Sequence, residues 1–311
     1  MLEVGPLRSW LYAPGNNPKL LERVFGAGAD AVILDLEDAV PPAEKQRARG
    51  MVADAVRARP GQAGPVVFVR VNHPDSGLTE QDIRAVVGPG VQGLRLPKVD
   101  SAETVMRVDD WISQAEAQAG IELGSLPLVC NIETARGVWY AEHIATACPR
   151  VLALAFGEVD FGRDVGTTVT PERLETLYAR SRLVLASRMA GIRPPVEGVY
   201  SQLANDAGLE RTTQQSRALG FFGRSVIHPR QVPIINRIFT PSTEELSWAR
   251  RVVEAATNAE QRGSGALQLE DGEFVDVPVV RRAEALLQLA DALASRIAQV
   301  SSTAQPPVSP N

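Results

Sequence analysis

Polar side chains, nearly all of them ionisable, follow almost every short apolar run in this sequence. Carboxylates in such places can hold a divalent cation or move a proton, and a neighbouring guanidinium or ammonium group can stabilise an anion. If the runs are parallel strands of one sheet, these side chains converge on a single small site. The residues are, in chain order, Glu37, Asp38, Arg70, Asn72, Lys98, Glu133, Glu158, Asp160 and His228.

Glu133 and Asp160 are the candidate ligands of a divalent metal. They follow the apolar runs LVCNI and VLALAF, and no His or Cys follows these runs to make a zinc or thiolate site. Hard oxygen ligands with few protein donors suit Mg²⁺, which keeps several waters and takes substrate oxygens. The alternative is that each carboxylate only caps the helix that begins beside it. Arg70, in FVRVN, would supply a fixed cation or would pair with Glu37 or Asp38, or do both.

The elements that must position these residues alternate between strand-like and helix-like segments. Several apolar runs are hydrophobic at nearly every position, as expected of parallel strands buried on both faces. Asn17-Pro18, Ser101 and Thr170-Pro171 place a capping side chain ahead of a helical pattern. The alternation predicts an α/β fold, a closed (β/α)₈ TIM barrel, and no glycine-rich motif follows the first strand to suggest a dinucleotide-binding sheet instead. The predicted strands are Ser9–Ala13, Ala31–Leu36, Val66–Val71, Gly93–Pro97, Pro127–Ile132, Val151–Phe156, Pro195–Tyr200 and Phe222–Ile227.

The pattern changes in the last quarter of the chain. Ser242 and Glu245 resemble a capping box ahead of a helix, and ALQLEDGEFVDVPVV is typical of a hairpin that turns at Asp271-Gly272. A last helix is expected to begin near Arg281, and this region would form a lid or an oligomerisation arm. The predicted domains are a catalytic barrel at 1–240, a C-terminal lid extension at 241–300 and a disordered tail at 301–311.

The composition of the 311 residues limits the class of protein. A hydrophobic fraction of 44% provides a sizeable core, and the net charge of -5 argues against a nucleic-acid partner. No apolar run approaches the ~18 residues that span a bilayer, and the first residues show no secretory pattern. Cys130 and Cys148 are the two cysteines, and neither lies in a CxxC motif. We therefore expect a cytoplasmic protein with reduced thiols and no membrane partner.

A series of motifs points to a known family. Together they resemble the citrate lyase β-subunit-like proteins of the HpcH/HpaI aldolase/citrate lyase superfamily, which include malyl-CoA and citramalyl-CoA lyases. The resemblance implies a Mg²⁺-dependent barrel with a C-terminal lid, assembled as a homotrimer or a hexamer. The motifs run from about Arg8 to Ala285 and are RSWLYAPGNNP, ADAVILDLEDAVPPAEK, VRVN, LPKV, NIETARGV, AFGEVDF, LYARSRLVLASR, EGVY, IHPRQV and VDVPVVRRAE.

The resemblance also implies roles for individual residues. Glu133 and Asp160 correspond to the metal ligands, and Arg70 corresponds to the arginine that binds substrate. Asp276 corresponds to an acid/base that reaches the barrel mouth of a neighbouring subunit. The remaining matches are Glu37, Asp38 and Lys98, which would hold metal waters and orient the site, and Arg8 and Lys19, which would lie near the phosphates of the thioester carrier.

Two segments depart from the family pattern. Many relatives have a lysine where GFFGR has Arg224, so this candidate for substrate or CoA binding keeps its charge but not its geometry. The segment GRDVGTTVTPE, which begins soon after Asp160, also differs, and it would line the mouth where substrates are sorted. Both departures concern the choice of substrate more than the type of reaction.

The implied reaction makes or breaks a carbon–carbon bond between an acetyl thioester and a 2-oxo acid. The substrate would be a malyl-, citramalyl- or citryl-like thioester of CoA or of an acyl carrier. Mg²⁺ would chelate its hydroxyl and carboxylate, Arg70 would stabilise the oxyanion, and Asp276 would exchange a proton with the enolate carbon. Two alternatives stay open, a malyl-CoA-type thioesterase on the same site and a citrate lyase β subunit in an acyl-carrier complex. A metal-dependent 2-oxo-acid aldolase is disfavoured, because those enzymes have a histidine where this chain has Asp38.

Overall fold

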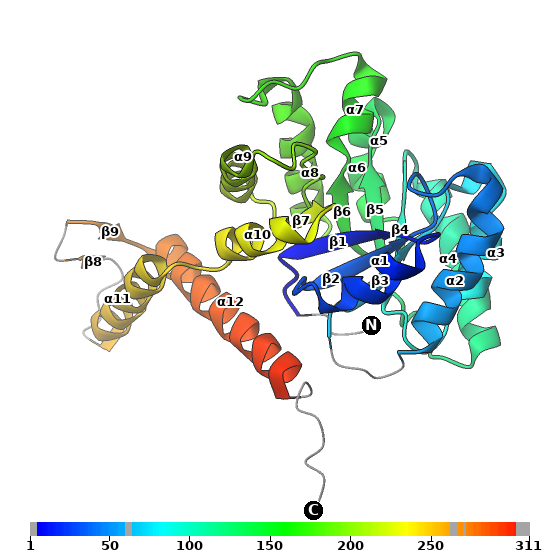
Figure 1. Cartoon of the computed structure of the whole chain (residues 1–311). Helices are drawn as coiled ribbons and strands as arrows, with labels where there is room; N and C mark the ends of the chain where they lie inside the picture. The colour runs from blue at the N-terminus through cyan, green and yellow to red at the C-terminus, as the bar shows by residue number, and fades with distance from the viewer. Residues whose placement is uncertain (1–4, 60–63, 262–266, 270–271, 303–311) are drawn as a thin grey trace, which may run out of the picture. The chain divides into compact units, whose positions relative to one another are not determined.

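The chain forms two compact units in the computed structural model, which describes residues 5–59, 64–261, 267–269 and 272–302 (Figure 1). The first unit ends at Phe239 and the second begins at Thr240. The division falls where the sequence pattern changes, and the roles expected of the two parts, catalysis and lid, stay predictions. In the described residues, every helix is too short or too polar to cross a membrane.

A parallel sheet of seven strands organises the first unit (Figure 1). The strand order is β6-β5-β4-β3-β2-β1-β7, so β1 to β6 lie in chain order and β7 pairs with β1. The sheet curls into a half-barrel, and the carboxyl ends of its strands share one rim. The strands are β1 (Ser9–Pro14), β2 (Ala31–Asp35), β3 (Val66–Arg70), β4 (Gly93–Leu96), β5 (Leu128–Ile132), β6 (Val151–Phe156) and β7 (Arg224–Val226).

The strand predicted at Pro195–Tyr200 is reduced to two bridges. Val196 makes an isolated parallel bridge to Ala155 of β6, and Glu197 makes one to Arg224 of β7. Pro195 has no N–H to give to a ladder, which shortens the run. The α/β class and the parallel strands are therefore confirmed, whereas within the described residues this sheet has seven regular strands in place of the predicted eight.

Alternate strand positions point to two different cores. The inner face of the sheet carries Trp10, Ile33, Phe68 and Val129, and the rings of Trp10 and Phe68 lie 4.8 Å apart. The position after Ile33, Leu34, belongs to the larger core between the sheet and the helices. These helices are α1 (Pro18–Arg23), α2 (Lys45–Arg57), α3 (Thr79–Val86), α4 (Ala102–Ala119), α5 (Ala135–Trp139), α6 (Ala141–Ala145), α7 (Glu158–Val165), α8 (Leu177–Met189), α9 (Asp206–Leu219) and α10 (Val232–Phe239).

Two of the three predicted helix starts are confirmed. Asn17 and Ser101 cap α1 and α4, each with a side-chain oxygen that accepts a backbone N–H. The start predicted at Thr170 is wrong, because α8 begins at Leu177. Arg173 accounts for the difference, since its φ of 57° is left-handed and no right-handed helix passes through such a residue.

The second unit is built from two helices and a short hairpin. The predicted capping box is confirmed: the Ser242 N–H donates to Glu245 Oε2 at 2.8 Å, and the Glu245 N–H donates to Ser242 Oγ at 3.2 Å. The hairpin is also confirmed, although Asp271 of its predicted turn lies outside the described residues. The elements are α11 (Thr243–Gln261), β8 (Leu267–Gln268), β9 (Phe274–Val275) and α12 (Val277–Ser302).

The last helix, α12, is longer than the sequence predicts. It begins at Val277, before the expected start near Arg281, and it includes Ser301 and Ser302 of the segment predicted to be a disordered tail. The rest of that segment, 303–311, lies outside the described residues.

Candidate active site

A cavity of about 360 Å³ opens at the carboxyl ends of the strands. Every strand of the seven-stranded sheet, or the residues just after it, contributes to its wall, as expected for a parallel α/β half-barrel. The polar residues that line it are Tyr12, Asp35, Asp38, Arg70, Arg95, Asn131, Glu133, Glu158, Asp160 and Ser225.

Arg70 is held in place by carboxylates from β2 and the loop that follows. Its Nε and Nη2 donate to the two oxygens of Asp35, each at 2.6 Å, in a bidentate pair. Its Nη1 lies 2.8 Å from Glu37 Oε2 and 3.7 Å from Asp38 Oδ2. The pairing of Arg70 with Glu37 and Asp38 that the sequence suggested is therefore present, and Asp35 is a third partner.

Lys98 joins the same group from the end of β4. Its Nζ contacts Glu37 Oε1 and donates to Asp38 Oδ1 at 3.1 Å. The backbone of Lys98 has φ 51°, an unfavourable value for a residue with a side chain. Strain of this kind often marks functional positions, where the surrounding structure holds a side chain in one orientation.

Glu37 and Asp38 differ in their affinity for a proton. Burial raises the pKa of Glu37 to about 7, although Arg70 and Lys98 oppose the shift. Burial acts in the same direction on Asp38, but its hydrogen bond with Glu37 and the charge of Arg70 lower the pKa of Asp38 below its usual value. The pair can therefore hold one proton near neutral pH, on Glu37.

Glu133 presents one free carboxylate oxygen. The residue is 3% exposed, and its Oε1 accepts a hydrogen bond from Asn131 Nδ2 at 2.7 Å. Its Oε2 is buried and has no hydrogen-bond partner among the described residues. Burial raises the pKa of Glu133, although its hydrogen bond with Asn131 and the charges of Arg70 and Lys98 oppose the shift.

Asp160 lines the same cavity from the first turn of α7. Its side chain is 30% exposed, and its Oδ1 lies 3.0 Å from Nη2 of Arg163 one turn later. Across the described residues no group of three or more His, Cys, Asp or Glu is arranged to hold a metal. A metal held by Glu133 and Asp160 would therefore take the rest of its ligands from water or from a bound molecule.

Arg95 reaches across the inner face of the sheet. Its Nε donates to Asn131 Oδ1 at 2.6 Å, and its Nη2 donates to Ser225 Oγ of β7 at 3.0 Å. Because the Asn131 carbonyl accepts from Arg95, its amide NH₂ must face Glu133. The contact thus orients the amide that bonds one oxygen of Glu133 and leaves the other free.

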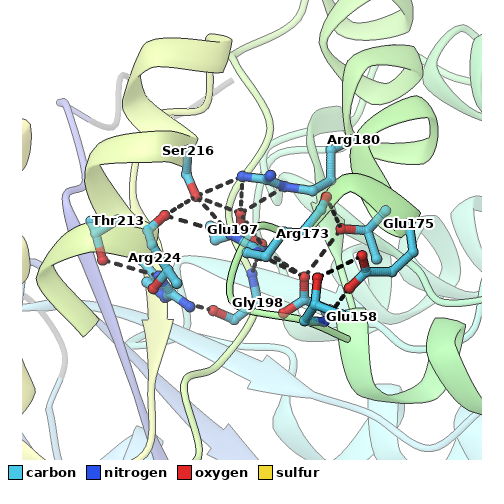
Figure 2. Close-up of polar contacts among 12 residues, drawn as sticks. Glu158, Arg173, Glu175, Arg180, Glu197, Gly198, Thr213, Ser216 and Arg224 are labelled. Atoms are coloured by element: carbon cyan, nitrogen blue, oxygen red, sulfur yellow. Dashed lines mark hydrogen bonds and ion pairs between the residues drawn. The ribbon is translucent and has the colours of Figure 1, made fainter. Parts of the chain in front are cut away.

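A buried charge network links the cavity wall to α8 and α9 (Figure 2). Arg173 Nη2 lies 2.6 Å from Oε1 of Glu158, which lines the cavity, and 3.2 Å from Oε2 of Glu197. Arg180 Nη2 contacts the same Glu197 oxygen at 3.0 Å. Burial alone would raise the pKa of Glu197, but the charges of Arg173, Arg180 and Arg224 lower it to about 2. Glu158 is therefore anchored by a chain of ion pairs behind it.

Arg224 belongs to this buried network and not to the cavity. Its Nε donates to the Gly198 carbonyl at 3.0 Å, and its Nη1 donates to the hydroxyls of Thr212 and Thr213 at 2.9 and 3.0 Å. Its neighbour on β7, Ser225, lines the cavity, so Arg224 points to the opposite face, toward the helices. The predicted contact with substrate or CoA does not agree with this position.

Arg8 and Lys19 lie at opposite ends of β1. Arg8 precedes the strand, is buried, and pairs with Asp30 through Nε–Oδ2 at 2.8 Å and Nη2–Oδ1 at 2.9 Å. The cavity is at the carboxyl ends of the strands, so the expected role of Arg8 near a carrier phosphate does not fit. Lys19 is exposed in the first turn of α1, after β1, and its phosphate contact stays a prediction.

Asp276 lies in the second unit, just ahead of α12. Its Oδ1 accepts the Val279 N–H at 3.2 Å and its carbonyl accepts the Val280 N–H at 3.0 Å, so it caps the helix. Its role as an acid/base for a neighbouring subunit stays a prediction.

Two other strand-end residues that the sequence singled out have structural roles. Asn72 is buried, and its Nδ2 donates to Asp82 Oδ2 at 2.6 Å. His228 Nδ1 accepts the Arg230 N–H at 3.2 Å and so caps a short 3₁₀ turn.

Sequence reasoning overlooked Asp35 and Arg95. Each stands inside an apolar strand, AVILD or GLRL, and reads as part of that strand and not of the loop after it. Side chains alternate between the two faces of a strand, so the sequence could have shown that these charged residues share the inner face of the sheet. A charged residue on the inner face of a buried strand needs a partner inside the barrel.

Comparison with known proteins agrees with these features. A family model for HpcH/HpaI aldolase/citrate lyase matches residues 8–229. Citrate lyase subunit beta of Leuconostoc mesenteroides subsp. cremoris is 37% identical over 285 residues, which cover 92% of this chain and 93% of the relative. The (3S)-malyl-CoA thioesterase of Cereibacter sphaeroides is 33% identical over 290 residues, which cover 93% of this chain and 96% of the relative.

A solved structure extends the similarity to three dimensions. Protein CitE of Mycobacterium tuberculosis, in complex with magnesium, acetoacetate and coenzyme A, matches this fold with a TM-score of 0.74 and 29% sequence identity. The match covers 93% of this chain and 99% of that chain, and so includes residues from both compact units.

Proposed function

The chain belongs to the HpcH/HpaI aldolase/citrate lyase family, and we propose that it is a Mg²⁺-dependent carbon–carbon lyase. It would cleave or form a 3-hydroxyacyl-CoA of the malyl-, citramalyl- or citryl-CoA type, with acetyl-CoA and a 2-oxo acid as the other partners. In this proposal the bridged segment Pro195–Tyr200 takes the place of the eighth strand in a closed (β/α)₈ barrel.

The observation that carries the proposal is the free Oε2 of Glu133. A buried acceptor is normally hydrogen-bonded, and this one has no partner among the described residues. It belongs to a cavity that Asp160 also lines, and oxygen donors of this kind suit Mg²⁺. Glu133 and Asp160 would hold the ion. The solved CitE complex contains magnesium and coenzyme A, which supports the same assignment.

Mg²⁺ in this place would supply a Lewis acid for the hydroxyl and carboxylate of the substrate. The protein supplies the rest of the charge stabilisation. Asp35 fixes the orientation of Arg70, whose remaining N–H groups would stabilise the oxygen that becomes negative as the bond breaks. Lys98, with Glu37 and Asp38, would position waters beside it.

Asp276 would complete the proton balance. Cleavage leaves an enolate of the acetyl thioester, and the carboxylic acid of Asp276 would donate a proton to its carbon. In the direction of synthesis the carboxylate would remove that proton. This role requires the arm of one chain at the cavity of another, so we propose a homotrimer or a hexamer.

An exposed apolar face supports self-assembly. Tyr178, Leu185 and Met189 of α8 are 64%, 69% and 60% exposed, and they recur at helical spacing on one side of the helix. Trp139 at the end of α5 is 64% exposed, and its carbonyl accepts from Arg182 of α8 at 2.8 Å. Exposed apolar side chains grouped in this way are typical of a surface that another subunit covers.

The relatives support two alternative functions for the same site. The malyl-CoA thioesterase relative supports hydrolysis as the second candidate reaction, because the same site needs only a positioned water for it. The citrate lyase relative supports a subunit that works on an acyl carrier.

Cys130 and Cys148 are both free thiols, as expected if the protein is cytoplasmic.

Product analysis tests the proposal. The purified protein is incubated with Mg²⁺ and malyl-, citramalyl- or citryl-CoA, and the products are identified by mass. Acetyl-CoA with a 2-oxo acid is the expected result, and Glu133→Gln and Asp160→Asn should lose both Mg²⁺ binding and turnover. Free CoA with an intact hydroxy acid would identify a thioesterase. Turnover of an acyl-carrier thioester alone would identify a complex subunit.

A further inference from the structure

Arg95 places a positive charge at the cavity that the proposed mechanism does not use. The residue is on β4, lines the cavity and is 2% exposed. Its two hydrogen-bonded partners, Asn131 and Ser225, are both neutral. Its third nitrogen, Nη1, is buried without a hydrogen-bond partner in the part of the chain that the structure describes.

Aromatic rings are the other close neighbours of this guanidinium. Its Cζ lies 5.4 Å from the ring centroid of Tyr12 and 5.9 Å from that of Trp10. Rings attract a cation but do not neutralise it. Glu133 and Asp35 attract Arg95 from beyond ion-pair distance, and a buried cation without a carboxylate in direct contact is costly. The arrangement is therefore best explained by a ligand that brings a negative charge to Arg95.

Arg70 offers a clear contrast to Arg95. Arg70 is paired with Asp35 and Glu37, and Asp38 is close by, so its charge is balanced within the protein. Glu133 and Asp160 would in turn be balanced by the divalent ion that they hold. Of the described basic residues that line this cavity, Arg70 and Arg95, Arg95 is the one without a carboxylate partner.

We propose that Arg95 binds a second carboxylate on the 2-oxo acid half of the substrate and thereby selects dicarboxylic over monocarboxylic 2-oxo acids. The inference rests on the proposed lyase function. The metal and Arg70 would bind the carboxylate next to the oxo group. A second carboxylate, further along the carbon chain of the acid, would reach the buried guanidinium of Arg95. A monocarboxylic acid would leave Nη1 unpaired, and such a loss produces strong discrimination.

Binding of oxaloacetate and pyruvate tests this selectivity, because the two acids differ by one carboxylate. Calorimetric titration in saturating Mg²⁺ should show that the wild type binds oxaloacetate about 10- to 100-fold more tightly. Arg95→Gln should bring this ratio close to one. Any loss of affinity for pyruvate in this variant should match its loss of Mg²⁺ affinity, because Arg95 also holds the Asn131 amide that bonds Glu133. The same ratio should appear in kcat/KM for condensation with acetyl-CoA.

Asn131→Ala is the matched control. It removes the bonds of Asn131 to Glu133 and to Arg95 Nε, but it keeps the charge of Arg95 and its bond to Ser225. It should therefore weaken Mg²⁺ and both acids together and keep the preference for oxaloacetate. Mg²⁺ affinity, titrated without any acid, measures the metal contribution of each variant separately. If Arg95→Gln does not fold, Arg95→Lys takes its place. Lysine keeps the charge but lacks the paired N–H donors of a guanidinium, so the ratio of oxaloacetate to pyruvate affinity should be intermediate.

The outcomes separate this inference from the proposed function. A wild type that turns over CoA thioesters but binds both acids equally overturns the role of Arg95 alone. An Arg95→Gln variant, or failing that an Arg95→Lys variant, with the wild-type ratio does the same. A wild type that binds neither acid and cleaves no thioester overturns both.

Discussion

Gly157 lies directly against Glu133. A Cβ atom on Gly157 would come within 2.4 Å of Glu133 Cγ and 2.9 Å of its Cδ. These distances are far shorter than the ~3.5 Å at which carbon atoms pack. The position of the Glu133 carboxylate therefore depends on the absence of a side chain at the end of the neighbouring strand.

Gly157→Ala should displace the carboxylate that is proposed to hold the metal. We expect Mg²⁺ affinity to fall about 10- to 100-fold, and lyase activity to fall with it. Calorimetric titration of Mg²⁺ measures the effect. Gly162→Ala is the matched control on α7, because its Cβ would approach no atom closer than the Thr167 carbonyl oxygen at 3.4 Å. Unchanged Mg²⁺ affinity in Gly157→Ala would show that Glu133 does not need this space.

The grouping of charges around Arg70 was predictable from the sequence. Glu37, Asp38 and Lys98 each follow a strand that its apolar run identifies, and parallel strands bring their carboxyl ends to one rim. The sequence alone could not show which of the two faces of the sheet each strand residue occupies. Arg224 shows this, because a shift of one position would have placed it in the cavity in place of Ser225.

Backbone conformation was the second limit of the sequence. The motif Thr170-Pro171 is a proper helix start by local rules, yet Arg173 adopts a left-handed φ and α8 begins later. The ion pairs of Arg173 with Glu158 and Glu197 hold it in this conformation, and both partners are distant in the chain. Local propensity carries no information about such long-range contacts.

Glu37 should make stability depend on pH in a defined window. Its folded pKa of about 7 lies above the ordinary value of 4.5, so the folded chain holds the proton more tightly. Its contribution to the free energy of unfolding is therefore present below about pH 4.5 and is lost as pH rises to about 7. Relative to Glu37→Gln, the metal-free wild type should lose roughly 1–3 kcal/mol across this window. Urea unfolding at a series of pH values measures the difference, and a difference that does not vary with pH would contradict the assignment.

Glu197→Gln should be strongly destabilising. It leaves Arg173, Arg180 and Arg224 buried around a neutral side chain, which costs about 3–5 kcal/mol at pH 7. The folded pKa of about 2 lies below the ordinary 4.5, so the contribution of Glu197 is full above about pH 4.5 and is lost as pH falls toward 2. The cost of the substitution should shrink over the same interval. Glu175→Gln removes a carboxylate that accepts from the Thr170 hydroxyl and makes no ion pair with an arginine in the described residues, so it should leave the unfolding midpoint nearly unchanged (Figure 2). Equal midpoints for the two variants would mean that the ion pairs around Glu197 add little.

Asp276→Asn should separate metal binding from turnover. Asparagine is as good a helix cap as aspartate, so α12 should keep its start and the thermal midpoint should not change. Mg²⁺ affinity should also stay at the wild-type level, since Glu133 and Asp160 are untouched. Loss of the acid/base should lower kcat by about 10²- to 10⁴-fold. Wild-type kcat in this variant would remove Asp276 from the mechanism.

Mixed oligomers test whether Asp276 acts on a neighbouring subunit. An Asp276→Asn chain keeps Glu133, and a Glu133→Gln chain keeps Asp276, so each is inactive by itself. When the two are co-expressed with different tags and purified together, a cavity from the first chain can receive the arm of the second. Random mixing in a ring makes about one site in four complete, and we expect about a quarter of the wild-type activity. If the mixture is as inactive as its two components, the arm does not serve the neighbour's cavity.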